Sequence, residues 1–409
     1  MMTRAASRLL GSVAGLTIVL YVATSRAYIT GSLTPGDLLV LTLLCVLLLS
    51  EGASRAVLRL VLGPYGILAL AITAAVLVSA LHSRRFLAAL NFDGQLLFTV
   101  WLAVPIVAAG IAELRDPFRF LRRLGVAYLV FFALGLVLLL GAGNDAILFR
   151  SGIGRVFQRF TTHPLQMILM AVGFAGAAFA ARRRLRHLLL LALSLIPVLL
   201  NANRTWMVTL ALLAVMAALG AARSARSLFA VVIGIAILGG VAYLVLGSSL
   251  VQDTWQIRLL NAPGFLEDEI RVASVQASLD AVSRHAGTLL LGEGWGSSGG
   301  DIVVHNVVIQ VLHEGGIFVL AALLALLALP AVWVLGARGG DRMTRQFVLM
   351  LTGAFVLFWM LNALSVERVY WMAYAVALGL AHRLRIGPAP AAAAAAFPAA
   401  PRLGGPVPA

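Results

Sequence analysis

The stretch from Val303 to Gly316, VVHNVVIQVLHEGG, carries ionisable and amide side chains inside an otherwise apolar run. Its polar members are His305, Asn306, Gln310, His313 and Glu314. Histidine changes its charge near neutral pH, so His305 can take a proton from a reacting hydroxyl as a general base. Residues four apart share one face of an α-helix, which places Asn306, Gln310 and Glu314 in a single polar stripe.

The stripe has a second interpretation, in which His305 only packs and makes hydrogen bonds at the start of a helix. Lipid satisfies none of the hydrogen bonds of a polar side chain, so a stripe at membrane depth must face the protein interior or a wet cavity. The accompanying polar residues and a long preceding loop favour the functional interpretation of His305. His313 and Glu314 lie about two turns deeper, so we expect them to support the site rather than to react.

A second polar group lies in NANRTW, residues 201–206, which contains Asn203 and Arg204. The planar guanidinium group binds anions through two parallel hydrogen bonds. Arg271 opens a helical pattern further along the chain, on the same side of the expected topology as Arg204 and His305. A guanidinium pair there would hold an anionic group. In the alternative, Arg204 only reaches toward the membrane interface, with Trp206 as an aromatic anchor.

Composition indicates the environment of these residues. The chain has 409 residues, of which 61% are hydrophobic and 11% charged, whereas a soluble domain has roughly 45–50% apolar and about 25% charged residues. We therefore expect an all-α polytopic membrane protein with about twelve transmembrane helices. The expected spans lie near residues 9–25, 33–50, 64–81, 96–113, 125–142, 165–181, 188–202, 205–222, 227–250, 316–337, 347–365 and 370–384.

The net charge of +15 does not indicate nucleic-acid binding, because the arginines follow membrane topology rather than a groove. All 31 basic residues are arginine. They gather in alternate connections, namely Arg55/Arg59, Arg115/Arg119/Arg122/Arg123, Arg182/Arg183/Arg184/Arg186, Arg223/Arg226, Arg338/Arg342/Arg345 and Arg383/Arg385. The positive-inside rule places these connections and both termini in the cytoplasm.

We expect one integral membrane domain, residues 1–386, with one long outer loop at 251–303. Connections beyond roughly 12–15 residues tend to be functional or disordered. This loop has an amphipathic helical pattern in EDEIRVASVQASLDAVSRH, with apolar residues at Ile270, Val272, Val275, Leu279 and Val282. The tail at 387–409 is rich in alanine and proline and is expected to be disordered and cytoplasmic.

Together these motifs resemble the O-antigen ligase and polymerase superfamily of bacterial envelopes. The resemblance rests on His305 and Asn306 followed by Gly316, on NRT at residues 203–205, on Arg271 at the start of the loop helix, and on the LLGEGWG turn before the histidine. It runs from about residue 163 to residue 314 and beyond. Two positions depart from the family pattern: Asn203 stands where serine or threonine is usual, and Val319 stands where a glycine or similar residue is expected.

The resemblance implies a metal-independent, inverting glycosyltransferase of the bacterial inner membrane, with a GT-C-like architecture and its active site on the periplasmic face. The donor would be a glycan on undecaprenyl diphosphate, supplied by the membrane. His305 would be the general base, Arg204 and Arg271 would bind the diphosphate, and Asn306, Gln310 and Asn203 would support them. The resemblance implies no metal and no cofactor.

Several alternatives stay open. The acceptor is expected to be a glycolipid, lipid A-core, which makes the chain a ligase; an O-antigen or exopolysaccharide polymerase is the alternative. A multispan transporter or lipid flippase would also show many spans with a few intramembrane charges, and a non-catalytic envelope protein is a third class. The roles of Arg155, Arg159, Arg284 and His313 stay open at this point.

Overall fold

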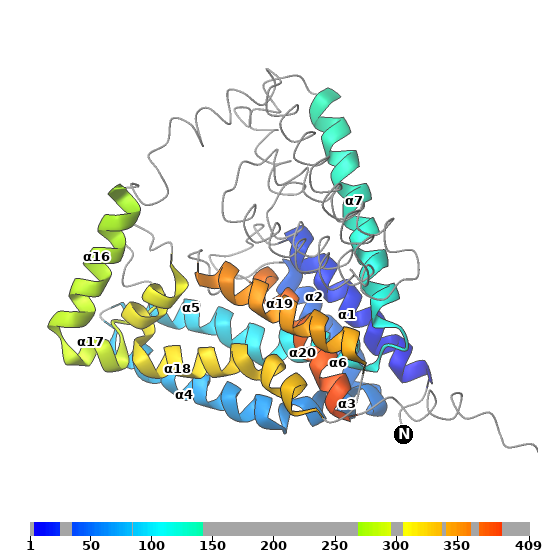
Figure 1. The fold of residues 1–409 in the computed structure, drawn as a ribbon, viewed down its shortest axis with the longest axis horizontal. Helices are drawn as coiled ribbons and strands as arrows, with labels where there is room; N and C mark the ends of the chain where they lie inside the picture. The colour runs from blue at the N-terminus through cyan, green and yellow to red at the C-terminus, as the bar shows by residue number, and fades with distance from the viewer. Residues whose placement is uncertain are drawn as a thin grey trace, which may run out of the picture.

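The computed structural model describes residues 4–24, 35–83, 85–141, 269–295, 306–337, 341–360 and 368–386. Within these ranges the regular structure is helical and no strand occurs (Figure 1), which confirms the all-α expectation for this part of the chain. The helices are α1 (Arg4–Thr24), α2 (Pro35–Leu48), α3 (Glu51–Val61), α4 (Pro64–His82), α5 (Phe86–Phe98), the π-helix η1 (Thr99–Ala103), α6 (Val104–Glu113), α7 (Pro117–Gly141), α16 (Glu269–Arg284), α17 (Ala286–Leu291), α18 (Val307–Gly336), α19 (Arg342–Met360) and α20 (Arg368–Ile386).

Three continuous helical stretches in the described residues are long and apolar enough to cross a membrane: Pro64–His82, Ala89–Glu113 and Val307–Gly336. A fourth is formed if α2 and α3, which meet at an angle of 113°, count as one broken span. These helices support the expected membrane protein. The count of about twelve spans stays a prediction, since the spans expected between residues 165 and 250 lie outside the described residues, as does the tail at 387–409.

The core is built around α6, whose residues Val104–Ala112 are all buried. This helix packs between α1 and α20. Small residues allow the close approach: a β-carbon added at Gly110 would lie 2.8 Å from the carbonyl oxygen of Leu10, and one added at Gly379 would lie 2.8 Å from the Cβ of Ile111. Glycine at helix contacts is the usual means by which membrane helices bring their backbones together.

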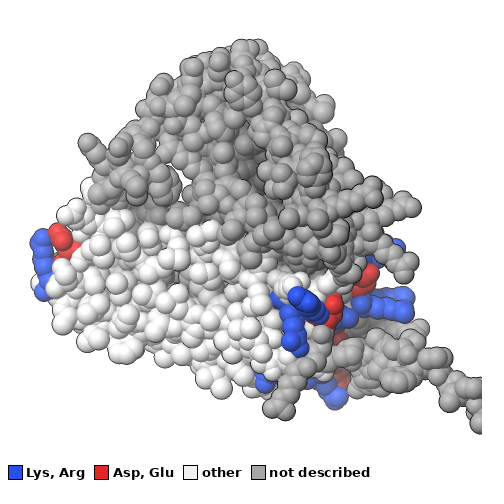
Figure 2. All heavy atoms as spheres, in the orientation of Figure 1, with Lys and Arg blue, Asp and Glu red and all other residues white. Residues whose placement is uncertain are grey.

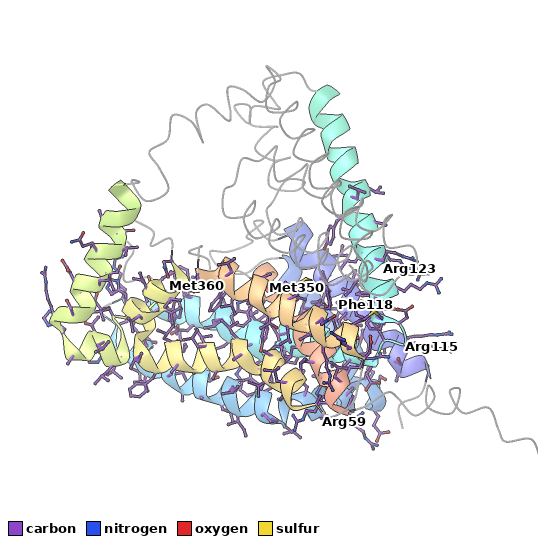
Figure 3. The ribbon with its side chains drawn as sticks, in the orientation of Figure 1. Arg59, Arg115, Phe118, Arg123, Met350 and Met360 are labelled. Carbon is purple, nitrogen blue, oxygen red and sulfur yellow. The ribbon has the colours of Figure 1, made fainter. Side chains whose placement is uncertain are left out.

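Many of the described arginines gather at one end of the described bundle, called here the arginine end and defined by Arg59, Arg115, Arg123, Arg383 and Arg385. Arg271 and Arg284 lie on α16, away from this end. Figure 3 places Arg59, Arg115 and Arg123 at this end, and Figure 2 shows most of the visible basic side chains there. The Arg383 guanidinium donates hydrogen bonds to the carbonyls of Leu114 and Arg115 at the end of α6. These bonds tie α20 to the turn that follows α6.

The opposite end is called the loop end and consists of α16, α17, residues 292–295 and the first turns of α18 (Figure 1). Both α16 and α17 pack against α18, and α18 also packs along α4. The predicted loop helix is present as α16, and its buried line is formed by Ser274, Ser278 and Val282. Leu279 is 45% exposed, so the side of α16 that packs against protein is set by small polar residues as much as by the expected apolar ones.

Candidate functional site

Asn306 starts α18 as its N-terminal cap. Its backbone is extended, and its side-chain oxygen accepts hydrogen bonds from the amides of Val308 (3.0 Å) and Ile309 (3.2 Å). A cap of this kind satisfies amides that have no partner within the helix. Asn306 therefore fixes the point at which α18 begins, directly after His305 in the sequence.

Helix α18 is broken at Gly316, which has φ +76° and ψ 178°. Only glycine adopts this conformation without strain. A side chain would also meet the backbone of the preceding loop, because a β-carbon at Gly316 would lie 2.7 Å from the amide nitrogen of Gly292. The residues from Val307 to Gly315 thus form a short helix that is separate from the longer apolar helix after the break. The expected span began at residue 316, which is the position of the break.

The broken segment is held by the GEG turn, residues 292–294. The amide of Glu293 donates to the carbonyl of His313 (3.0 Å), and the amide of Gly294 donates to the carbonyl of Glu314 (2.8 Å). The Ser79 hydroxyl of α4 donates to the same Glu314 carbonyl (2.8 Å). A break in a membrane helix leaves carbonyls without their usual partners, and these three donors satisfy two of them.

The deeper part of the polar stripe of α18 faces the protein interior, as expected from the sequence, whereas Asn306 and Gln310 are half-buried. His313 and Glu314 are buried, and the Gln310 amide donates to the Glu314 carboxylate (Nε2 to Oε2, 3.2 Å). The His313 ring approaches Glu293 in the loop, with 3.5 Å between Nε2 and Oε2. The Gln310 and His313 side chains therefore lie beside two carboxylates at the loop end.

A further buried acid, Asp93 of α5, was not among the residues expected from the sequence. It is 0% exposed, and neither carboxylate oxygen has a hydrogen-bond partner within the described residues. Glu314 lies close enough to act on it electrostatically. The sequence interpretation began the span at residue 96 and left Asp93 in a connection. The available signal was that Asp93 is the single ionisable residue between residues 86 and 112.

The structure brings only part of the expected site together. Asn306 and Gln310 share the first segment of α18, and Arg271 belongs to α16, which packs against α18. His305, Arg204 and Asn203 lie outside the described residues, so their convergence with Arg271 stays a prediction.

Within the described ranges, no group of three or more histidine, cysteine or acidic side chains is placed to hold a metal ion. No protein-family model matches the chain, and comparison with curated proteins finds no match either.

Proposed function

We propose that the chain is a membrane glycosyltransferase that moves a glycan from undecaprenyl diphosphate to an acceptor hydroxyl at its loop end. The observation that carries this proposal is the Asn306 cap. It starts α18 at the loop end, and His305 immediately precedes it in the sequence. Arg271 belongs to α16, which packs against the same helix. One proposed diphosphate ligand therefore lies on a helix that packs against α18, the helix that the proposed base precedes in the sequence.

The reaction would proceed by direct displacement. His305 removes the proton of the acceptor hydroxyl while the hydroxyl oxygen attacks the anomeric carbon. The bond from that carbon to the diphosphate oxygen breaks, which inverts the anomeric configuration. Arg204 and Arg271 stabilise the negative charge that develops on the leaving diphosphate, so the two guanidinium groups take the role that a metal ion has in other transferases.

The proposed setting is the bacterial inner membrane, with the loop end in the periplasm and both termini in the cytoplasm. The arginine end supports this orientation, because cytoplasmic connections of membrane proteins are enriched in arginine and lysine. Lipid A-core is the proposed acceptor. A second lipid-linked unit, which would make the chain a polymerase, is the alternative within the same reaction class.

The proposal is tested by measuring glycan transfer by the purified full chain. The chain is placed in lipid vesicles that contain both undecaprenyl-diphosphate-linked glycan and lipid A-core. We expect glycosylated lipid A-core from the wild type, none from His305→Ala, and an undiminished rate from His285→Ala. His285 is the matched control because it is an exposed histidine between α16 and α17. Wild-type transfer by His305→Ala would overturn the proposal. Lengthened lipid-linked glycan in vesicles without lipid A-core would identify a polymerase.

A transporter or lipid flippase is the second candidate, and one specific observation favours it. Asp93 is buried inside a helical stretch that is long enough to span the membrane, and Glu314 is buried in the short segment of α18 before the break at Gly316. Buried carboxyl groups at such positions are common in ion-coupled transporters. Movement of lipid-linked glycan between leaflets, at equal rates in wild type and His305→Ala and without any transfer to acceptor, would favour this class over the transferase.

A further inference from the structure

Four ionisable residues lead from the surface of the loop end toward the interior. Glu293, in the GEG turn, has a side chain that is 41% exposed. His313 is buried with its Nε2 atom 3.5 Å from the Glu293 carboxylate. Glu314 follows in the chain and acts electrostatically on Asp93, which is wholly buried. Chains of acidic and histidine side chains that enter a membrane domain are typical of proton pathways.

The surroundings of Asp93 are poor in groups that would stabilise its ionised form. Neither of its oxygens receives a hydrogen bond within the described residues. Among the described residues, the ionisable group that acts on Asp93 electrostatically is Glu314 on α18. Burial of an isolated ionised carboxylate costs far more free energy than burial of the neutral acid, so such groups bind a proton instead.

The neighbouring Glu314 has a different environment. Its carboxylate accepts a hydrogen bond from the Gln310 amide, which favours the ionised form. The two acids are therefore unequal, and Asp93 is the one that the geometry selects for the proton.

We propose that Asp93 is an intramembrane proton-binding site, and that Glu314, His313 and Glu293 connect it to the surface at the loop end. A proton leaving the Asp93 carboxyl oxygen is accepted by the Glu314 carboxylate, then by a ring nitrogen of neutral His313, and then by the Glu293 carboxylate. The reverse order loads Asp93. Neither ring nitrogen of His313 makes a hydrogen bond within the described residues, so one can accept a proton while the other donates one.

The first experiment detects the bound proton by infrared spectroscopy of the full chain in lipid vesicles at neutral pH. We expect a carbonyl band of a protonated carboxyl group that is absent in Asp93→Asn and retained in Asp280→Asn. Asp280 is the matched control because it lies on the exposed side of α16, paired with Arg284. The proposal is overturned if no band sensitive to Asp93→Asn exists.

A second measurement keeps the test decisive if Asp93→Asn does not fold. Carbon-13 labelling of aspartate shifts the band in the wild type without any substitution at residue 93. Asp37, which is also buried, must be excluded as the source, so the shifted band must persist in Asp37→Asn. A band that labelling leaves in place would overturn the proposal.

The third experiment tests the path. After a rapid rise in pH, the Asp93 band should decay about 100-fold more slowly in His313→Ala than in the wild type, a typical factor for loss of a proton-transferring side chain. His285→Ala should decay at the wild-type rate. Equal rates in all three proteins would overturn the role of His313.

A proton site is distinguished from a sodium site by recording the carbonyl band in sodium and again with N-methylglucamine in place of sodium. A band that is present only without sodium would show that sodium occupies the site, and it would overturn the proposal. None of these measurements uses a glycan donor or acceptor, so they can succeed or fail independently of the proposed transfer reaction.

Discussion

The two ends of the described bundle differ in how their charged side chains are paired. At the arginine end, Arg383 bonds to the backbone carbonyls after α6, and Arg385 stacks over the Trp333 ring at 5.1 Å. At the loop end, the Gln310 side-chain oxygen and both His313 nitrogens are buried without a hydrogen bond within the described residues, and so are both carboxylate oxygens of Asp93 in α5. The arginine end has such an atom too, His382 Nδ1, but among the described residues Asp93 is the only acid in this group.

We interpret the difference as a division of roles, in which the arginine end holds the helices together and the loop end carries the function. Most buried polar groups in proteins are paired, and those that are not call for an explanation such as a catalytic role or a bound ion. Cations that are paired with carbonyls hold helices together, whereas unpaired buried acceptors are costly and persist where a function needs them. We therefore expect substitutions at the arginine end to change stability alone and substitutions at the loop end to change function as well.

The largest expected effect is that of Gly316→Ala. An alanine at φ +76° is strained, and its β-carbon would meet the backbone of the GEG turn. We expect a loss of about 3 kcal/mol in the free energy of unfolding. Thermal unfolding in lipid vesicles measures it, with Gly353→Ala in α19 as control, because a β-carbon there has no neighbour within 4 Å. Equal melting temperatures for the two variants would show that the break does not depend on glycine.

Arg383→Ala should come next, with a loss of about 2 kcal/mol from the removal of charge-assisted bonds to the carbonyls after α6. The rate of glycan transfer per folded molecule should stay at the wild-type value. Arg55→Ala is the control, because its ion pair with Glu51 is exposed and should contribute little. A drop in the transfer rate of folded Arg383→Ala would contradict the assignment of the arginine end to anchoring.

Ser79→Ala tests the hydrogen bond between α4 and the break in α18, for which we expect a smaller effect. It removes one of the two donors to the Glu314 carbonyl, which should cost about 1 kcal/mol. Thr42→Ala removes an exposed bond within α2 and should leave the unfolding midpoint unchanged. If both variants unfold at the wild-type temperature, the attachment of α4 to the break contributes nothing to stability.

The smallest effect is expected for Arg284→Ala on α16. Its ion pair with Asp280, at 3.3 Å, is exposed, and such pairs contribute about 0–1 kcal/mol. Neither the melting temperature nor the transfer rate should change measurably. A large loss of transfer would place Arg284 in substrate binding and move the site outward from the α18 cap.

Apolar length and charge could be read from the sequence, and the spans expected at 64–81 and 370–384 agree closely with α4 and α20. Helices α18 and α19 begin several residues before the spans expected at 316–337 and 347–365. The polar stripe of α18 was also predicted to face inward, because lipid satisfies none of its hydrogen bonds. The break at Gly316 was not predicted, since a glycine in an apolar run shows no periodicity signal and the contacts that fix it come from residues 290–294.

Asp93 was missed for a related reason. An acid at the edge of an apolar run is normally taken as the boundary of a span, because its burial is costly. Its electrostatic neighbour Glu314 lies on α18, more than two hundred residues away in the chain, and that proximity cannot be read from the sequence. The start of α18 at Asn306 agrees with the expectation that a helix begins at the His305–Asn306 segment; the role of Asn306 as its cap was not predicted.

The contact between the GEG turn and the break has an evolutionary consequence. A β-carbon at Gly292 would lie 2.7 Å from the carbonyl carbon of Gly315, just as one at Gly316 would meet the backbone on the other side. Both obstacles are main chain, so no compensating side-chain change elsewhere can make room for either. Distant homologues should keep glycine at both positions even where the surrounding sequence has diverged.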